Sequence, residues 1–173
     1  TSTVEYTLSD NNGNKSICSY NVVITDTQVP TVITQNITVQ LDATGNATIT
    51  AAQVDNGSTD NCGIATMTVL PNTFTCANVG PNTVTLTVTD ANGNISTGTA
   101  TVTIQDTVLP TVITQNITVQ LDATGNATIT AAQIDNGSTD NCSIATMTVL
   151  PNTFTCANVG PNTVTLTVTD ANR

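Results

Sequence analysis

The sequence has no His and no Trp, and only two of its 173 residues are basic. Without His it lacks the commonest acid/base group and metal ligand at neutral pH. Without clustered Lys and Arg it lacks the basic surface with which proteins bind phosphate and nucleic acid. Only 8% of the residues are charged and 2% aromatic, whereas a typical soluble domain carries about 25% charged residues. We therefore expect neither an enzyme nor a nucleic-acid-binding protein.

Threonine and asparagine dominate what is present. The chain has 40 Thr and 21 Asn, and its formal charge of −10 comes from eleven Asp and one Glu. Thr favours strands and Asn favours turns, so this composition predicts a β-rich protein. No stretch is typical of a membrane span or a signal peptide, and we expect no membrane insertion.

The chain repeats itself with a period of 80 residues. The stretch that begins at Pro30 returns at Pro110, and the 64 aligned pairs differ only at Val54/Ile134, Gly63/Ser143 and Gly93/Arg173. This divides the chain into a first segment (1–29, the end of a preceding repeat), a middle segment (30–109, a complete repeat) and a last segment (110–173, a repeat lacking its final strand). Such similar copies favour a spacer or fibre over a chain with one active site.

Apolar residues within the repeat alternate with Thr, as in Val84, Leu86 and Val88. This period of two predicts strands with one buried face, and turn signals rich in Asp, Asn, Gly and Pro separate them. We expect strands at 32–34 and 36–41, 47–52, 64–70, 73–76, 82–90 and 96–105, and no helix. About seven short strands with this spacing predict an all-β fold of tandem immunoglobulin-like β-sandwich repeats.

Two cysteines of each repeat predict a disulfide. Cys62 and Cys76 recur as Cys142 and Cys156, and a pair in each repeat favours an intradomain bond in an oxidising compartment. A metal site is less favoured, because two thiols without His do not complete a zinc shell. Closing a loop of about 14 residues would stabilise a core poor in aromatic side chains by roughly 3 kcal/mol.

Aspartates gather at the predicted junctions between repeats. In a sandwich of this topology, the junction leaves one repeat opposite the loops of the next. Carboxylate and amide oxygens there could hold Ca²⁺, which takes six to eight oxygen ligands; no other cofactor is expected. The alternative is that these residues only cap turns and keep the surface soluble. The candidates are Asp26, Asp55, Asp60 and Asp90 at one junction and Asp106, Asp135, Asp140 and Asp170 at the next.

Three motifs occur once per repeat in a fixed order: Asp60-Asn61-Cys62-Gly63, Thr89-Asp90-Ala91-Asn92-Gly93-Asn94 and Asp106-Thr107-Val108-Leu109-Pro110. In these the chain resembles, over its whole length, the hyalin-repeat (HYR) family of immunoglobulin-like modules. That family usually has a cysteine on its last strand, as Cys18 provides in the first segment. The middle segment departs from this pattern with Gly98, which makes Cys76 the expected partner of Cys62. For Cys18 we expect a partner upstream of Thr1.

The near-identical, Thr-rich and Asn-rich copies are also similar to the giant cell-surface adhesins that gliding bacteria export by a type IX secretion system. The resemblance implies an extracellular shaft that mediates surface attachment or gliding and projects a distal element for an unknown surface or glycan ligand. Its partners would be neighbouring repeats of the same chain and other copies in a fibre. Asp106-Thr107-Val108 resembles an O-glycosylation acceptor of such proteins, so Thr107 is a candidate modification site.

Other functions remain open at this stage. A carbohydrate-binding or other ligand-binding module is the main alternative, although few aromatic side chains are available to hold a sugar ring. The Thr rows at 83–89 and 97–103 also allow an ice-binding surface. The missing final strand of the last segment allows two arrangements, a longer array of repeats or a polymer in which another chain donates that strand.

Overall fold

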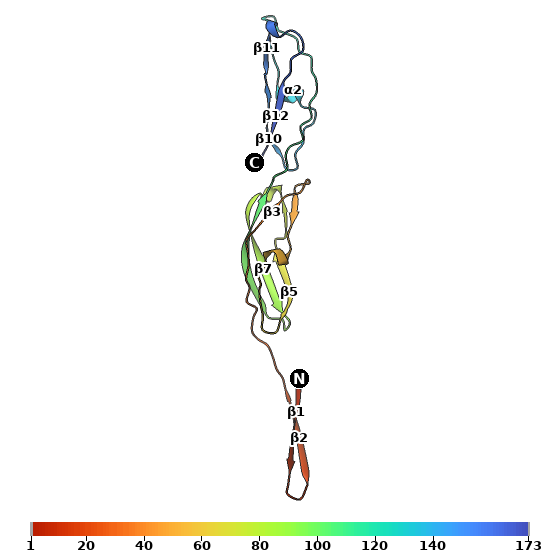
Figure 1. Cartoon of the computed structure of the whole chain (residues 1–173), viewed down its shortest axis with the longest axis vertical. Coiled ribbons are helices and arrows are strands. Elements are labelled where there is room, and N and C mark those ends of the chain that lie inside the picture. The colour runs from red at the N-terminus through yellow and green to blue at the C-terminus, as the bar shows by residue number, and fades with distance from the viewer. Residues whose placement is uncertain (1, 173) are drawn as a thin grey trace.

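The computed structural model describes residues 2–172. The three segments follow one another along a single long axis (Figure 1). Strands make up 48% of the chain and helices 8%, which confirms the predicted all-β class. Within residues 2–172, no helix is both long enough and apolar enough to cross a membrane.

The first segment is a hairpin of β1 (Ser2–Ser9) and β2 (Lys15–Val22). Its turn is stabilised by Asp10, whose Oδ1 accepts hydrogen bonds from the backbone N–H groups of Asn12 and Asn14. The apolar side chains of the hairpin, such as Tyr6 and Leu8, are exposed. A two-stranded ribbon has no second layer against which to bury them.

The middle segment contains a four-stranded sheet in the order β3-β8-β7-β5 and a separate pair, β4-β6. β3 runs parallel to β8, whereas the other neighbours are antiparallel. The alternating apolar residues of β7 point into one core with Phe74 of β6, and Val84, Leu86 and Val88 are completely buried. The bounds are β3 Ile37–Gln40, β4 Asn46–Thr48, β5 Ile64–Leu70, β6 Thr73–Thr75, β7 Gly80–Asp90 and β8 Ile95–Gln105.

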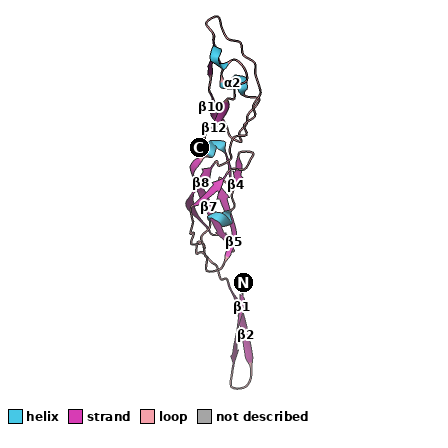
Figure 2. Cartoon of the chain, turned by 45° about the horizontal axis from the view of Figure 1, so that its top comes forward, coloured by secondary structure: helices cyan, strands magenta, loops and turns pink. Residues whose placement is uncertain are grey.

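The expectation of no helix was wrong. The predicted strand at 47–52 ends at Thr48, and one helical turn, α1 (Ala51–Val54), follows it. Thr50 and Gln53 form a capping box at its start, and Val54 is fully buried at its end. A capping box satisfies the free N–H groups of a first turn, which offsets the β propensity of the sequence. A short 3₁₀ helix (Cys76–Asn78) follows β6, and Figure 2 shows these helices among the strands.

The last segment has nearly the same sequence as the middle one but less structure. It keeps the small pair β9-β11 and the pair β10-β12, but within residues 110–172 it has no counterpart of β8. Residues 117–120 repeat the sequence of β3 and form no strand, since β3 depends on β8 for its hydrogen bonds. Its elements are β9 Asn126–Thr128, α2 Ala131–Ile134, β10 Ile144–Leu150, β11 Thr153–Thr155, a 3₁₀ helix at Cys156–Asn158 and β12 Thr165–Asp170.

Burial differs accordingly between identical residues. Leu86 and Phe74 are buried in the middle segment, whereas their equivalents Leu166 and Phe154 are only partly buried. Identical sequences thus differ both in the strands they form and in the core they enclose, because the neighbouring strand is present in only one of the two segments.

Candidate functional site at the joint between segments

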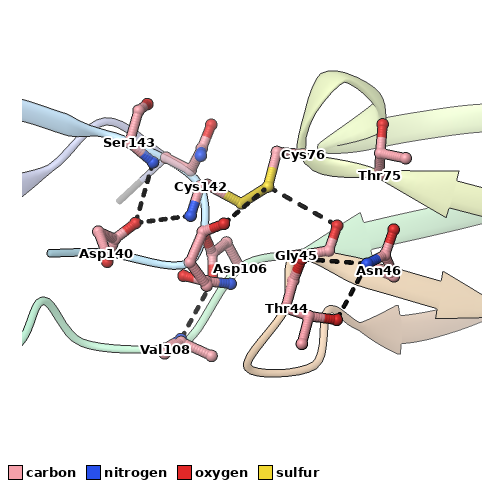
Figure 3. The surroundings of a disulfide bond; sticks show 12 residues. Thr44, Gly45, Asn46, Thr75, Cys76, Asp106, Val108, Asp140, Cys142 and Ser143 are labelled. Atoms are coloured by element: carbon pink, nitrogen blue, oxygen red, sulfur yellow. Dashed lines mark hydrogen bonds between the residues drawn. A yellow bond between two sulfur atoms is a disulfide. The ribbon is translucent and has the colours of Figure 1, made fainter.

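A disulfide bond joins the middle and last segments. Cys76, which follows β6, is bonded to Cys142, which lies just before β10 (Figure 3). Their Cα atoms are 5.4 Å apart although the two residues are 66 positions apart in the sequence. We call the surroundings of this bond the second joint; it includes Asp106, Asp140, Asn141 and Asp170.

The predicted pairings of Cys62 with Cys76 and of Cys142 with Cys156 were therefore wrong, although Cys76 and Cys142 are disulfide-bonded. The reason is the length of β5, which lies between Cys62 and Cys76. Its seven residues span about 23 Å at the rise of a strand, so the two thiols lie near opposite ends of the segment. Cys76 therefore bonds to Cys142 of the following segment instead of to Cys62.

Gly45 allows the two segments to approach. Its φ of +75° belongs to the left-handed region that favours glycine. A Cβ atom there would lie 2.6 Å from Cys76 Sγ and 2.8 Å from the backbone oxygen of Asn141. The absence of a side chain at Gly45 is thus a requirement of the joint.

Asn141 links the two segments by hydrogen bonds. Its Nδ2 donates to Asp106 Oδ1 over 3.1 Å and to the backbone oxygen of Asp42 over 3.2 Å. Asp106 Oδ1 also accepts from the backbone N–H of Val108. The covalent bond and these polar contacts all lie at the same boundary.

Three cysteines are free and exposed: Cys18, Cys62 and Cys156. Cys62 occupies the position of Cys142, and Cys156 occupies that of Cys76, one period away. A hydrogen bond to Asp26 raises the pKa of the Cys62 thiol, and desolvation and the negative charges of Asp26, Asp60 and Asp90 act in the same direction. Cys62 is therefore a weaker nucleophile than an ordinary exposed thiol at neutral pH.

Gly98 explains why the middle segment has no cysteine on its last strand. A Cβ atom at this position would lie 2.8 Å from Val32 Cγ1 and 3.1 Å from Thr34 Cγ2. Val32 and Thr34 therefore leave no room beside Gly98 for the side chain that Cys18 carries in the first segment.

The structure brings together six of the eight predicted aspartates. Three converge at the second joint and three equivalents at the first joint, the boundary between the first and middle segments. In each set, one carboxylate oxygen from every residue lies within 4.8 Å of the other two. The sets are Asp106, Asp140 and Asp170, and Asp26, Asp60 and Asp90.

Asp55 and Asp135 do not belong to either set. Asp55 instead accepts hydrogen bonds from the backbone N–H groups of Gly57 and Ser58, and Asp135 does the same one repeat later. Hydrogen bonding by the Ser58 side chain holds the pKa of Asp55 below its usual value. These two residues stabilise turns, as in the alternative interpretation of the sequence.

Other predicted and unpredicted residues lie at the same boundary. The Thr107 side chain is exposed, and its hydroxyl is 3.1 Å from Gln40 Oε1, to which it donates; its glycosylation stays a prediction. Sequence reasoning missed the roles of Gly45 and Asn141. The only signal for them was their place in a Gly-containing turn and beside a cysteine.

The comparisons give no relative for this chain: it matches no protein-family model, no curated protein and no solved structure.

Proposed function

We propose that this chain is part of the shaft of an extracellular adhesin or filament, and that the shaft holds a distal binding element away from the cell surface. The observation that carries the proposal is the Cys76–Cys142 bond, which ties one segment to the next along the long axis. A catalytic or ligand-binding module has no need of such a bond at the boundary between two near-identical copies.

The fold supports this role. The four-stranded sheet and the β4-β6 pair contribute to one core, which is what the immunoglobulin-like sandwich hypothesis requires. In an array of such repeats, Cys62 would pair with the equivalent of Cys76 in the preceding copy, and Cys156 with the equivalent of Cys142 in the following copy. Every boundary would then be covalent.

The chemistry of the bond supports an extracellular location. Structural disulfides persist in oxidising compartments and are rare in the cytosol. A surface of Thr and Asn side chains stays soluble with few charges. Repeating one unit lengthens a shaft while every boundary between repeats uses the same contacts. The resemblance to hyalin-repeat modules and to type IX-secreted adhesins of gliding bacteria leads to the same proposal.

Small-angle X-ray scattering of the oxidised chain tests the shaft. We compare it with Cys76→Ser/Cys142→Ser and with the matched control Cys62→Ser/Cys156→Ser, which removes two thiols that are free here. The oxidised chain and the control should scatter as the same extended rod, whereas the first variant should show a broader distribution of shapes. Equal profiles for all three proteins would argue against a disulfide-stiffened shaft.

A glycan array with the same oxidised protein separates the main alternative. A shaft should bind no glycan by itself, because recognition belongs to the distal element. Specific, saturable binding of a glycan by this chain would replace the proposal with a carbohydrate-binding function.

A further inference from the structure

Within residues 2–172, the carboxylates of the second joint have no basic side chain beside them. Asp106 and Asp170 are only 6% and 4% exposed, and Asp140 is half-buried beside them. Within residues 2–172 the one basic side chain is Lys15, which starts β2 in the hairpin at the far end of the molecule (Figure 1). Three converging carboxylates without a cation repel one another, and more strongly when buried.

Four buried oxygens of this joint have no hydrogen-bond partner in the described chain: Asp106 Oδ2, Asp140 Oδ1, Asn141 Oδ1 and Asp170 Oδ2. Buried polar atoms are nearly always paired, and an unpaired buried charge is strongly unfavourable. The amide nitrogen of Asn141 donates to Asp106, so the unpaired amide oxygen belongs to a group already held against the carboxylates. This set of oxygens needs an electropositive partner.

We propose that the second joint binds a calcium ion through Asp106, Asp140 and Asp170, with the side-chain oxygen of Asn141. All four groups offer oxygen, which Ca²⁺ prefers, and a flexible set of six to eight ligands leaves room for backbone oxygens or water. Zinc is disfavoured because the neighbouring sulfur of Cys142 is held in a disulfide. Mg²⁺ demands near-ideal octahedral geometry and gives up its water reluctantly.

The ligands come from both sides of the boundary. Asp106 follows β8 of the middle segment, whereas Asp140 and Asn141 precede β10, and Asp170 ends β12 of the last segment. Bound calcium therefore fixes the last segment to the middle one, independently of the disulfide. The claim that calcium stiffens a shaft rests on the proposed function. The claim that the second joint binds calcium does not.

The first joint provides a comparison inside the molecule. There Asn92 Nδ2 donates to Asp26 Oδ2, and Asn94 Nδ2 donates to Asp90 Oδ2. Of the three carboxylates, only Asp60 keeps a buried oxygen without a partner. Amide groups thus pair some of the carboxylate oxygens of the first joint, and the unpaired oxygens of Asp106, Asp140 and Asn141 carry the proposal for the second joint.

Isothermal titration of the oxidised full-length chain with Ca²⁺ alone tests the proposal, together with melting temperatures in millimolar calcium and in EDTA. We expect binding in the range of extracellular modules, about 10⁻⁴–10⁻³ M, and a higher melting temperature with calcium. Asp106→Asn and Asp140→Asn should each weaken binding by about tenfold or more. Asp122→Asn is the matched control, since Asp122 caps a turn and the substitution removes the same charge.

Each outcome decides the matter. The proposal is overturned if the titration gives no heat and calcium does not change the melting temperature. It is also overturned if binding survives both Asp106→Asn and Asp140→Asn, or if Asp122→Asn loses binding to the same extent. Binding abolished by Asp26→Asn but kept in Asp140→Asn would also overturn it, because the ion would then occupy the first joint. If Asp106→Asn fails to fold, the half-buried Asp140 supplies the deciding variant. A chain that binds no calcium but keeps its disulfide-dependent rod shape refutes this inference and leaves the shaft standing.

Discussion

Removing the inter-segment disulfide should cost more stability than removing an intradomain bond would. The bond between Cys76 and Cys142 closes a loop of 66 residues. On the chain-entropy relation this constrains the unfolded chain by about 4 kcal/mol, against about 3 kcal/mol for a loop of 14 residues. For a chain of this size, about 4 kcal/mol corresponds to a loss of roughly 8–16 °C in melting temperature.

Thermal and urea unfolding of Cys76→Ser/Cys142→Ser, followed by circular dichroism, measures this loss. The control is Cys62→Ser/Cys156→Ser, which changes two exposed free thiols and should stay within about 0.5 kcal/mol of wild type. The reasoning fails if the control loses as much stability as the first variant, or if the first variant matches wild type.

The pairing itself is open to direct mapping. Cleavage before Asp places Cys62 and Cys76 in one fragment (60–89) and Cys142 and Cys156 in another (140–169). Without reduction, the pairing found here yields these two fragments as one cross-linked species. Two separate fragments, each with an internal disulfide, would refute it.

Three further predictions use matched positions of the repeat. Leu86→Ala should cost about 3 kcal/mol because the side chain is completely buried, whereas Leu166→Ala, partly exposed, should cost less in the same urea unfolding assay; equal losses would contradict the difference in packing. Gly45→Ala should lower the yield of the inter-segment disulfide on oxidation, because its Cβ meets the Cys76 sulfur, while Gly125→Ala should leave that yield unchanged. Because a hydrogen bond to a carboxylate raises the pKa of Cys62, its alkylation near neutral pH should be slower than that of Cys156 in the same molecule, with the difference shrinking as the pH rises. Site-resolved mass spectrometry measures these rates, and equal rates at neutral pH would count against the acidic environment.

Most strands of the middle segment were predictable, because apolar residues that alternate with Thr indicate one buried face. The predicted strand at 32–34 was wrong, since this stretch makes only isolated bridges at Thr31 and Thr34. The ranges 64–70 and 96–105 agree with β5 and β8 to within a residue. The turn at Ala51–Val54 was not predictable from alternation, since a capping box and one buried Val decide it. Alternation also does not show whether a strand finds its neighbour: residues 117–120 repeat the sequence of β3 but form no strand, since within residues 110–172 there is no counterpart of β8.

The candidate site was predictable in composition but not in connectivity. Topology alone placed Asp106 opposite Asp140 and Asp170, and these carboxylates do converge. The disulfide was mispredicted because the pairing was inferred from the two cysteines of each repeat, although the strand predicted at 64–70 already lies between them and, as β5, carries them to opposite ends. The need for Gly45 is a property of contact between two segments, which no single repeat reveals.

The position of the disulfide also determines how far the proposed shaft could be stretched. Under tension along the chain, the covalent path crosses the bond, so residues 77–141, which lie between Cys76 and Cys142, form a closed loop that bears no backbone load. In an array with this pairing, only the 14 residues from Cys142 to Cys156 of each repeat could be drawn out. At about 3.5 Å per extended residue, each repeat would lengthen to about 50 Å instead of the roughly 280 Å of an unlinked one. Such a filament would behave as a nearly inextensible tether even after its sheets had come apart.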